Sequence, residues 1–594
     1  MRRITMSFIR DMEEQVGAKV SEALSAMGAA DLQFTVEPSA LEGSDLSVPC
    51  FTMSKALRKA PAAIAEELAA AISPSGLIKE VSAKNGYLNF TANPAPMVKE
   101  VLEDIIARGK DCGTMPSTGL RVNVEHTSTN PTGPIHVGRA RNPIIGDTLA
   151  RCLKRCGHQV STEYYVNDVG KQVVILTWGV NNVSDEEAEA EREAHAKAAE
   201  NEKERDKTDH RLVAKYRVAN RRMESDPEVQ AEIADMLRRF EAGDKEVISS
   251  VRKTAEAMLG GLKETLAAIN VTLDTYTWES RFIEDGSARD VVDRLNSSEY
   301  AGRTDDGACS VDLKDFGIQG KNTKFTFTRS DGTTLYTTRD LAYHLDKFTR
   351  ADRVIDVLGE DQKLGSQQLC AALEILGSEK KPEPLFYAFV SLPEGKMSTR
   401  RGVVVYLDDL IDEAVEHAYQ EIRSRTEVRG SDMSEEKMRE IARIVGVGAI
   451  RYNIVRVQPE KQFVFKWSEA LNFDGNSGPY LQYVHARACS MLRKAGSFER
   501  VADPSLLDDR FEINLVKVLS RYEEVLKQAG DGKRIHLLPA YGHDVAVAFN
   551  QFYAAVSVLD AGPRRDARLT LVECAKTVMA DVLDCLGMGA PEEM

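Results

Sequence analysis

The sequence predicts an α/β protein with a central parallel β-sheet, a helical insertion within that sheet, an α+β part before it and an all-α part after it. Three observations support this fold class. Residues 121–166 read as a strand, a Gly/Pro-rich loop, a helix and a second strand, an order that favours parallel pairing with a right-handed crossover. Residues 184–265 are dominated by Glu, Lys, Arg and Ala at helical spacing. Beyond residue 430, apolar positions recur at helical spacing to the end, which is typical of a helix bundle.

The composition is that of a soluble globular protein. The 594 residues are 43% hydrophobic and 28% charged, and at about 100–200 residues per domain they suffice for several domains. No apolar run reaches the ~18 residues of a membrane span, and the N-terminal stretch is too acidic for a signal peptide. We therefore expect a cytoplasmic protein without a membrane segment. The net charge of −15 argues against unspecific coating of nucleic acid but is compatible with a local basic face.

The nine cysteines are scattered and form no CxxC pair. Cys152 and Cys156 are four residues apart in a predicted helix and so share a face, but a metal site would need two further ligands nearby. We expect buried thiols in a reducing compartment and no metal held by the protein.

The N-terminal part mixes helix and strand patterns. FTMSKALRKAPAAIAEELAAAI reads as a strand end followed by an amphipathic helix, and KEVSAKNGYLNFTAN as two short strands around a turn at Asn85-Gly86. GKDCGTMPSTGL, at 109–120, has the composition of a linker. The charged block at 184–265 is expected to be a solvated helix pair without chemistry, with partial disorder as the alternative.

The loop NPTGPIHVG lies between the strand RVNVEHTST and a helix that begins near Gly138. Helix N-termini bind phosphate through free N–H groups, and Gly133 and Gly138 allow a close backbone approach. His136, Arg139 and Arg141 are expected to donate hydrogen bonds to that phosphate. On its own, such a loop also fits a purely structural turn.

A second candidate segment is EGKMSTRRG at 394–402. Its basic side chains and hydroxyls would suit a loop that covers a triphosphate and stabilises the charge of a leaving pyrophosphate. An exposed basic hairpin without a ligand is the alternative when this segment is taken alone.

Together the two segments resemble the HIGH and KMSKS motifs of class I aminoacyl-tRNA synthetases. Two positions depart from those motifs: Arg139 stands for the second His and Thr399 for the second Lys. Arg139 still donates and stays charged, and Arg400 is next to Thr399. The stretches VEHTSTNPTGPIHVGRARN, YYVNDVGKQ, SDGTTLYTTRDLAYH, FDGNSGPYLQYVHAR and LGMGAPEEM resemble the arginyl-tRNA synthetase family, especially its archaeal form. The resemblance covers almost the whole chain and is weakest at 184–265.

The resemblance implies five parts. Residues 1–112 would be an added domain that touches the tRNA elbow, and 113–183 the first half of a Rossmann-like catalytic domain. Residues 184–268 would be the insertion, 269–428 the second half of the catalytic domain, and 429–594 a helical anticodon-binding domain.

The resemblance also implies the residues that act on ATP. The catalytic set is His136, Gly138, Arg139, Lys396, Ser398 and Arg400. The ATP-binding set is Pro131, Thr132, Gly133, Pro134, His136, Gly138, Arg139, Asn142, Gly359, Asp361, Lys396 and Met397.

A guanidinium substrate needs carboxylates that match its planar fork. The resemblance assigns arginine binding to Glu125, Ser128, Asn130, Tyr336, Asp340 and Gln362. Tyr336 and Asp340 are four residues apart, so they would face one way if a helix begins there.

The expected tRNA contacts are aromatic and basic side chains, which stack on bases and meet phosphates. The resemblance places them at Tyr87, Asn89, Tyr480, Tyr483, Arg487, Tyr553 and Met594. A tyrosine stripe on a helix also fits core packing.

The reaction implied is ATP, L-arginine and tRNA(Arg) giving AMP, diphosphate and L-arginyl-tRNA(Arg) through an arginyl-adenylate, with Mg²⁺ accompanying ATP. The family generally needs bound tRNA for arginine activation, and we expect the same here. We further expect a monomer without an obligate protein partner. Three alternatives remain: a class I synthetase for another amino acid, a nucleotidyltransferase of the same superfamily, and a non-catalytic tRNA-binding paralogue, which the changes at Arg139 and Thr399 would suit.

Overall fold

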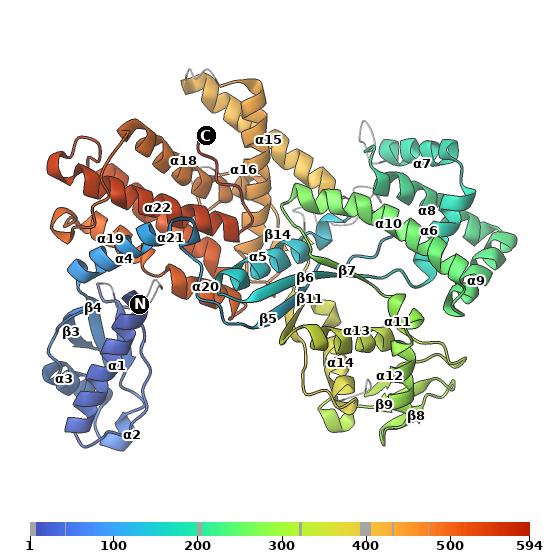
Figure 1. Ribbon diagram of the computed structural model, residues 1–594, viewed down its shortest axis with the longest axis horizontal. Coiled ribbons are helices and arrows are strands. Elements are labelled where there is room, and N and C mark those ends of the chain that lie inside the picture. Colours follow the sequence, from blue (N-terminus) through green and yellow to red (C-terminus); the bar gives the residue numbers. More distant parts are fainter. Residues whose placement is uncertain are drawn as a thin grey trace.

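The structure, a computed structural model, describes residues 8–41, 43–198, 205–319, 323–391, 405–429, 433–472 and 475–594. Figure 1 shows the N-terminal domain at lower left, below the C-terminal helices. The central sheet lies between these helices and the insertion at upper right, and a further lobe lies at lower right. No helix among the described residues is both long and apolar enough to cross a bilayer.

The N-terminal domain packs helices on one antiparallel sheet of order β1-β2-β4-β3. Its turn at Asn85-Gly86 was predicted and is confirmed, with φ of 53° and 80° at the two residues, the left-handed values that Asn-Gly hairpin turns need. The elements are α1 (Phe8–Ala26), β1 (Glu37–Pro38), β2 (Leu46–Pro49), α2 (Ser54–Leu57), α3 (Pro61–Ala71), β3 (Ile78–Lys84), β4 (Tyr87–Ala92) and α4 (Pro94–Arg108).

The predicted parallel sheet is confirmed. Its order is β12-β11-β5-β6-β7, and every neighbouring pair is parallel. The strands are β5 (Arg121–Glu125), β6 (Gln159–Val166), β7 (Thr275–Trp278), β11 (Arg353–Gly359) and β12 (Glu383–Tyr387). Because β5 and β11 are neighbours, the winding of the chain reverses between them. In open parallel sheets, ligands bind beyond the carboxyl ends of the strands at this switch point.

Helix α5 (Arg141–Arg155) joins β5 to β6 after a 3-10 turn at Val137–Arg139. It crosses close over the end of β5: a Cβ on Gly146 would lie 2.3 Å from the side chain of His126. Only glycine fits this crossing. Helices α13 (Tyr336–Arg350) and α14 (Lys363–Ile375) flank β11 on either side in the sequence.

A small lobe precedes α13. It packs short helices on an antiparallel sheet of order β10-β9-β8. Its elements are α11 (Arg281–Glu284), α12 (Ser287–Asn296), β8 (Ala301–Arg303), β9 (Cys309–Asp312) and β10 (Lys324–Thr326).

The expectation of a solvated helix pair at 184–265 is wrong. The described residues form four helices, and the last three of them share a buried core with α6, in which Ile233, Phe240 and Val251 are at most 1% exposed. The charged composition hid these apolar positions. The helices are α6 (Lys171–Asn182), α7 (Asp185–Ala198), α8 (Thr208–Ser225), α9 (Pro227–Glu241) and α10 (Lys245–Ala268).

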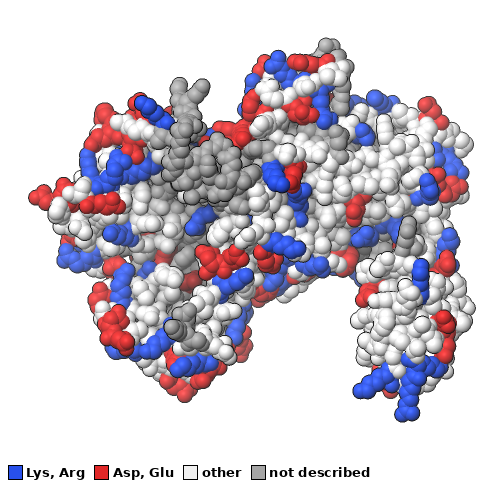
Figure 2. Space-filling model, turned by 180° about the vertical axis from the view of Figure 1, so that it is seen from behind, with Lys and Arg blue, Asp and Glu red and all other residues white. Residues whose placement is uncertain are grey.

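The C-terminal part is a helix bundle, as predicted. A short parallel pair of β13 (Val390–Ser391) and β14 (Phe463–Val464) links it to the catalytic part. The helices are α15 (Leu407–Arg429), α16 (Glu435–Val455), α17 (Trp467–Ala470), α18 (Gly478–Ala495), α19 (Arg510–Leu519), α20 (Tyr522–Gly530), α21 (Leu537–Ala555) and α22 (Arg565–Cys585). All nine cysteines are free and seven are buried. Figure 2 shows Lys and Arg interspersed with Asp and Glu over one face.

Candidate active site

The loop after β5 leaves the sheet through two residues with left-handed backbone. Thr127 has φ of 73° and Ser128 of 33°, conformations that cost energy in residues other than glycine. The Ser128 hydroxyl donates to Glu125 Oε1 at 2.9 Å and accepts from the Tyr165 N–H at 3.1 Å. The strained loop is therefore fixed to the ends of β5 and β6.

His136 lies at the start of the 3-10 turn and forms an antiparallel bridge with Tyr406. The Val137 N–H donates to the Val405 carbonyl at 3.1 Å, and the Leu407 N–H donates to the Ile135 carbonyl at 2.7 Å. His136 reaches solvent, yet the surrounding protein desolvates its charged form and, together with the charge of Arg139, lowers the pKa of His136. The ring is therefore neutral at neutral pH and stands beside the exposed Arg139.

The second motif falls outside the described residues. Lys396, Met397, Ser398, Thr399 and Arg400 all belong to the undescribed range 392–404. The description resumes at Val405, whose carbonyl accepts the hydrogen bond from the first motif. The residues that follow the second motif are thus paired directly with the residues around His136.

The expectation that Arg141 donates to phosphate is wrong. Its side chain is fully buried, and its donors go to the backbone carbonyls of four residues: Ala388, Val457, Gln458 and Lys461. Desolvation lowers the pKa of Arg141 to about 10, which still leaves it charged. Arg141 holds α5 against the segment that leads into the C-terminal bundle.

The other residues expected to bind ATP lie on two loops at the switch point. Pro131, Thr132, Gly133 and Pro134 belong to the loop after β5. Asn142 accepts the Thr127 N–H at 2.6 Å and donates to the Val357 carbonyl at 3.0 Å, so it ties this loop to β11. Gly359 ends β11. A Cβ on Gly359 would lie only 2.4 Å from Asp361 Oδ1, so the carboxylate packs closely against the glycine.

Helix α13 begins at Tyr336, as the pairing of Tyr336 with Asp340 required. Tyr336 is 67% exposed, and the Asp340 side chain is 35% exposed. Asn130 lies 3.5 Å from the side chain of Gln172, and Gln362 is exposed at the start of α14. Tyr336, Asn130 and Gln362 are thus exposed, and Asp340 is partly exposed.

A buried chain of charges joins the two expected arginine-binding carboxylates. Lys347 Nζ is 2.8 Å from Glu125 Oε2 and 2.8 Å from Asp356 Oδ1. His344 Nε2 is 2.9 Å from Asp356 Oδ2, and its Nδ1 is 3.1 Å from Asp340 Oδ1. Burial and Lys347 oppose the charged imidazole, but Asp356 and Asp340 prevail and raise the pKa of His344 to about 10. Acidic and basic groups therefore alternate from Glu125 to Asp340.

The expected tRNA contacts of the N-terminal domain surround a cavity of about 250 Å³. Tyr87 and Asn89 line it together with Lys84. Asn89 is 3% exposed; its amide accepts from the Ser39 hydroxyl at 3.0 Å and donates to the Tyr87 carbonyl at 3.2 Å. Phe51, 49% exposed, contacts the Tyr87 ring edge-on, with the ring centres 5.2 Å apart.

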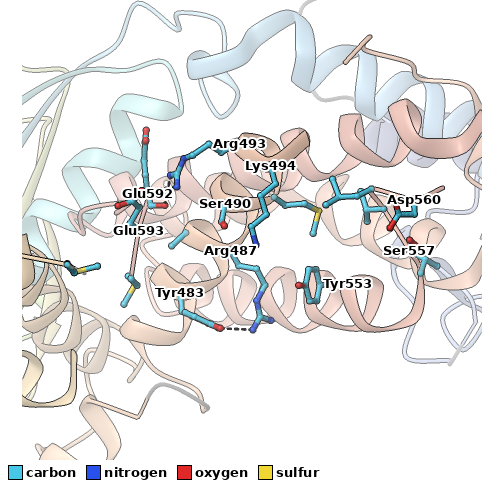
Figure 3. Close-up of a pocket in the computed structure, with 17 residues that line it drawn as sticks. Tyr483, Arg487, Ser490, Arg493, Lys494, Tyr553, Ser557, Asp560, Glu592 and Glu593 are labelled. Carbon is cyan, nitrogen blue, oxygen red and sulfur yellow. Dashed lines mark hydrogen bonds and ion pairs between the residues drawn. The ribbon is translucent and has the colours of Figure 1, made fainter. Parts of the chain in front are cut away.

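A cavity of about 770 Å³ brings together four expected tRNA contacts of the bundle, Tyr483, Arg487, Tyr553 and Met594 (Figure 3). The Arg487 guanidinium lies 4.6 Å from the centre of the Tyr483 ring and 5.0 Å from that of Tyr553. Arg487 also donates to the Tyr483 hydroxyl at 2.8 Å. Tyr480 does not line the cavity; its hydroxyl accepts from Asn550 at 2.8 Å.

Models of known families match three ranges of the chain. The model described as tRNA synthetases class I (R), catalytic domain, matches residues 102–467. The model of the arginyl tRNA synthetase N terminal domain matches 14–92, and that of the DALR anticodon binding domain matches 481–594. The chain belongs to the arginyl-tRNA synthetase family.

Relatives agree over nearly the full length. The arginine–tRNA ligase of Methanocella arvoryzae is 44% identical over 98% of this chain and 99% of its own. That of Methanothermobacter thermautotrophicus is 36% identical over 98% of this chain and 100% of its own. The solved arginyl-tRNA synthetase of Thermus thermophilus has a TM-score of 0.80 at 29% identity, covering 98% of this chain and all of its own.

The sequence analysis did not identify Lys347, His344 or Asp356 as residues of the site. A signal for them existed in the sequence. Asp340, His344 and Lys347 follow one another at intervals of four and three, which places them on one helical face. Asp356 is a lone carboxylate inside the apolar strand pattern of β11. Charges at such positions need partners when they are buried.

Proposed function

We propose that this chain attaches L-arginine to tRNA(Arg), converting ATP to AMP and diphosphate through an arginyl-adenylate. The observation that carries this proposal is the position of Glu125 and Asp340. They come from β5 and α13 and are linked by Lys347, Asp356 and His344 at the same switch point as the His136 loop. An arginine substrate whose guanidinium is bound by Glu125 and Asp340 would direct its own carboxylate toward the phosphates bound at that loop.

In the first step, the carboxylate of arginine attacks the α-phosphorus of ATP, and diphosphate leaves. No side chain of the enzyme needs to act as a nucleophile, so catalysis is positioning plus stabilisation of the developing phosphate charge. We assign this work to His136, Arg139 and the N–H groups near Gly138. Lys396, Ser398 and Arg400 would contribute from the second motif, with Met397 beside the nucleotide.

In the second step, the terminal ribose hydroxyl of tRNA attacks the carbonyl of the adenylate, and AMP leaves. Mg²⁺ would arrive with ATP as part of the substrate, bound by phosphate oxygens and water. The ATP site would comprise the loop after β5, Gly359 at the end of β11 and Asp361 in the turn that follows it.

The arginine site would use Ser128, Asn130, Tyr336 and Gln362 around the two carboxylates. Tyr336 supports this role because it is exposed one helical turn before Asp340. The tRNA would span the molecule, with its elbow at Tyr87 and Asn89 and its anticodon at the cavity around Arg487. The five-part division at residues 112, 183, 268 and 428 follows from these roles. We further propose that the enzyme is a cytoplasmic monomer.

Aminoacylation of total tRNA with each of the twenty amino acids tests the proposal. We expect charging with arginine alone. Charging with lysine or glutamine would overturn the assignment of Glu125 and Asp340, and charging with nothing would identify a non-catalytic paralogue.

A further inference from the structure

The helical insertion and the start of α15 meet in a buried cluster of charges. Lys207 Nζ lies 3.0 Å from Asp408 Oδ2 and 3.1 Å from Asp209 Oδ2. His210 Nε2 lies 3.1 Å from Asp408 Oδ2, and the Thr265 hydroxyl donates to Asp408 Oδ1 at 3.0 Å. Every member is at most 9% exposed. Helices α8 and α10 thus hold one carboxylate of α15 from two sides.

This cluster contains a group of metal-ligand type, because ligand atoms of Asp209, His210 and Asp408 lie within 4.8 Å of one another. The ammonium of Lys207, however, already contacts both carboxylates. Burial raises the pKa of Asp408, but the contacts with His210 and Lys207 lower it by more and leave it at about 2. The cluster is therefore a set of paired charges that needs no ion.

Asp408 is distant from the His136 loop in the sequence but close to it in space. It follows Tyr406 and Leu407, and these residues pair with Ile135 and His136. The Tyr406 ring contacts His136 and His210 edge-on, with ring centres 6.0 Å and 5.0 Å apart. The insertion thus reaches His136 through a single aromatic ring.

Two further contacts join α8 of the insertion to the surroundings of His136. Arg217 of α8 donates to the Tyr406 hydroxyl at 2.8 Å. Gly133, in the loop before His136, lies against Val213 of α8, where a Cβ would come within 3.1 Å of the valine methyl. Arg205 pairs with Asp412 in the next turn of α15.

We propose that the insertion positions His136 for catalysis: Lys207 and His210 hold Asp408, and Arg217 holds Tyr406, so that the segment Val405–Leu407 fixes the backbone on both sides of His136. The inference rests on the proposed role of His136 in the activation of arginine. Lys207, His210 and Arg217 are positioning residues, since none of them touches the loop's predicted ligands.

The physical reason is the cost of separating buried charges. A buried pair contributes little net stability, but removal of one partner strands the other charge in a low dielectric. Asp408 without Lys207 would turn toward solvent and carry Tyr406 with it. A misplacement of about 1 Å at a catalytic group costs up to about 100-fold in rate.

The test uses the full chain and arginine-dependent exchange of pyrophosphate into ATP, with tRNA present. We expect Lys207→Met to lower kcat at least about tenfold while the KM values for arginine and tRNA stay within about twofold. Arg239→Met is the matched control, because Arg239 pairs with Asp244 on the exposed side of the same insertion. It should leave kcat unchanged. A Lys207→Met enzyme with the kcat of the control would overturn the inference.

Loss of a buried lysine can also unfold the insertion, so Arg217→Met and Tyr406→Phe provide a second measurement. Each removes one end of the same hydrogen bond, and we expect each to lower kcat by a similar factor, with no further loss in the double variant. Unequal and additive effects would contradict a path through the Tyr406 hydroxyl.

A double-mutant cycle with His136→Ala separates positioning from a general loss of structure. In the His136→Ala background, Lys207→Met should cost little more in kcat, because the group it positions is gone. A full, multiplicative loss in that background would overturn the inference. Absence of exchange by the unmodified chain would instead refute the proposed function.

Discussion

Lys347 lies between Glu125 and Asp356, with its ammonium 2.8 Å from a carboxylate oxygen of each. The lysine side chain is fully buried and its nitrogen is 4.3 Å from the centre of the Tyr343 ring. Both carboxylates raise the pKa of Lys347 against the effect of burial, which keeps it charged. Glu125 is therefore oriented by Lys347 on one oxygen and by Ser128 on the other before any substrate arrives. A preoriented carboxylate binds a guanidinium without first losing its own rotational freedom.

Lys347→Met should weaken arginine binding and the fold together. Two buried carboxylates lose their common partner, a change that typically costs about 3–5 kcal/mol. We expect a lower Tm and at least a tenfold higher KM for arginine, about 1.4 kcal/mol or more of lost binding, with the KM for ATP nearly unchanged. Lys381→Met, at an exposed pair with Glu374, is the control. An unchanged KM for arginine in a folded Lys347→Met enzyme would show that Glu125 does not depend on Lys347.

Asp340→Ala should raise the KM for arginine far more than the KM for ATP. Its carboxylate is the more exposed end of the chain of charges, at 35% against 13% for that of Glu125. Steady-state kinetics with each substrate varied in turn will measure the two effects. Asp293→Ala, in an exposed i,i+4 pair on α12, should change neither constant. Normal arginine dependence of Asp340→Ala would remove Asp340 from the pocket.

The raised pKa of His344 predicts that the stability of the fold declines at alkaline pH. Its folded pKa of about 10 lies above the ordinary histidine pKa of 6.5, so the protonated ring, bound to Asp356 and Asp340, stabilises the fold. That contribution is complete below about pH 6.5 and is lost as the pH rises toward about 10. The Tm difference between the unmodified chain and His344→Gln should shrink across this window. His417→Gln, on the exposed side of α15, should show no such trend. A difference that is constant with pH would contradict the charged state of His344.

The sequence predicted the sheet, the bundle and the face shared by Tyr336 and Asp340 because each depends on local periodicity. It could not predict contacts that depend on how distant elements meet. Lys207 is one lysine among many in a charged block, and only the packing of α8 and α10 on α15 makes it a buried one. The prediction that Arg141 contacts phosphate was wrong for a different reason. Arg139 ends the 3-10 turn and is exposed, whereas Arg141 begins α5 and points into the protein, a difference that the spacing of the two arginines does not reveal.

Arg487→Met should impair tRNA charging and leave arginine and ATP binding intact. The guanidinium lies between the Tyr483 and Tyr553 rings, where a base can stack and a phosphate can be neutralised (Figure 3). We expect a rise of about tenfold in the KM for tRNA, at the scale of one stacking contact. Arg500→Met, at an exposed pair with Glu573, is the control. Equal KM values for tRNA in both variants would place the anticodon elsewhere.

Arginine activation should depend on tRNA, as expected for this family. Pyrophosphate exchange measured with arginine and ATP should be much faster in the presence of tRNA(Arg) than in its absence. Added tRNA of another specificity serves as the control for ionic effects. Equal exchange rates with and without tRNA(Arg) would contradict the expectation.

Arg141 makes the two ends of the enzyme thermodynamically inseparable. One buried guanidinium bonds the start of α5, two residues after Arg139, to the carbonyls of Val457, Gln458 and Lys461, which lead into the anticodon-binding helices. Neither segment can shift alone without stranding a buried cation or its acceptors. Any coupling of tRNA binding to ATP binding through Arg141 must therefore be reciprocal. The factor by which tRNA tightens ATP binding equals the factor by which ATP tightens tRNA binding.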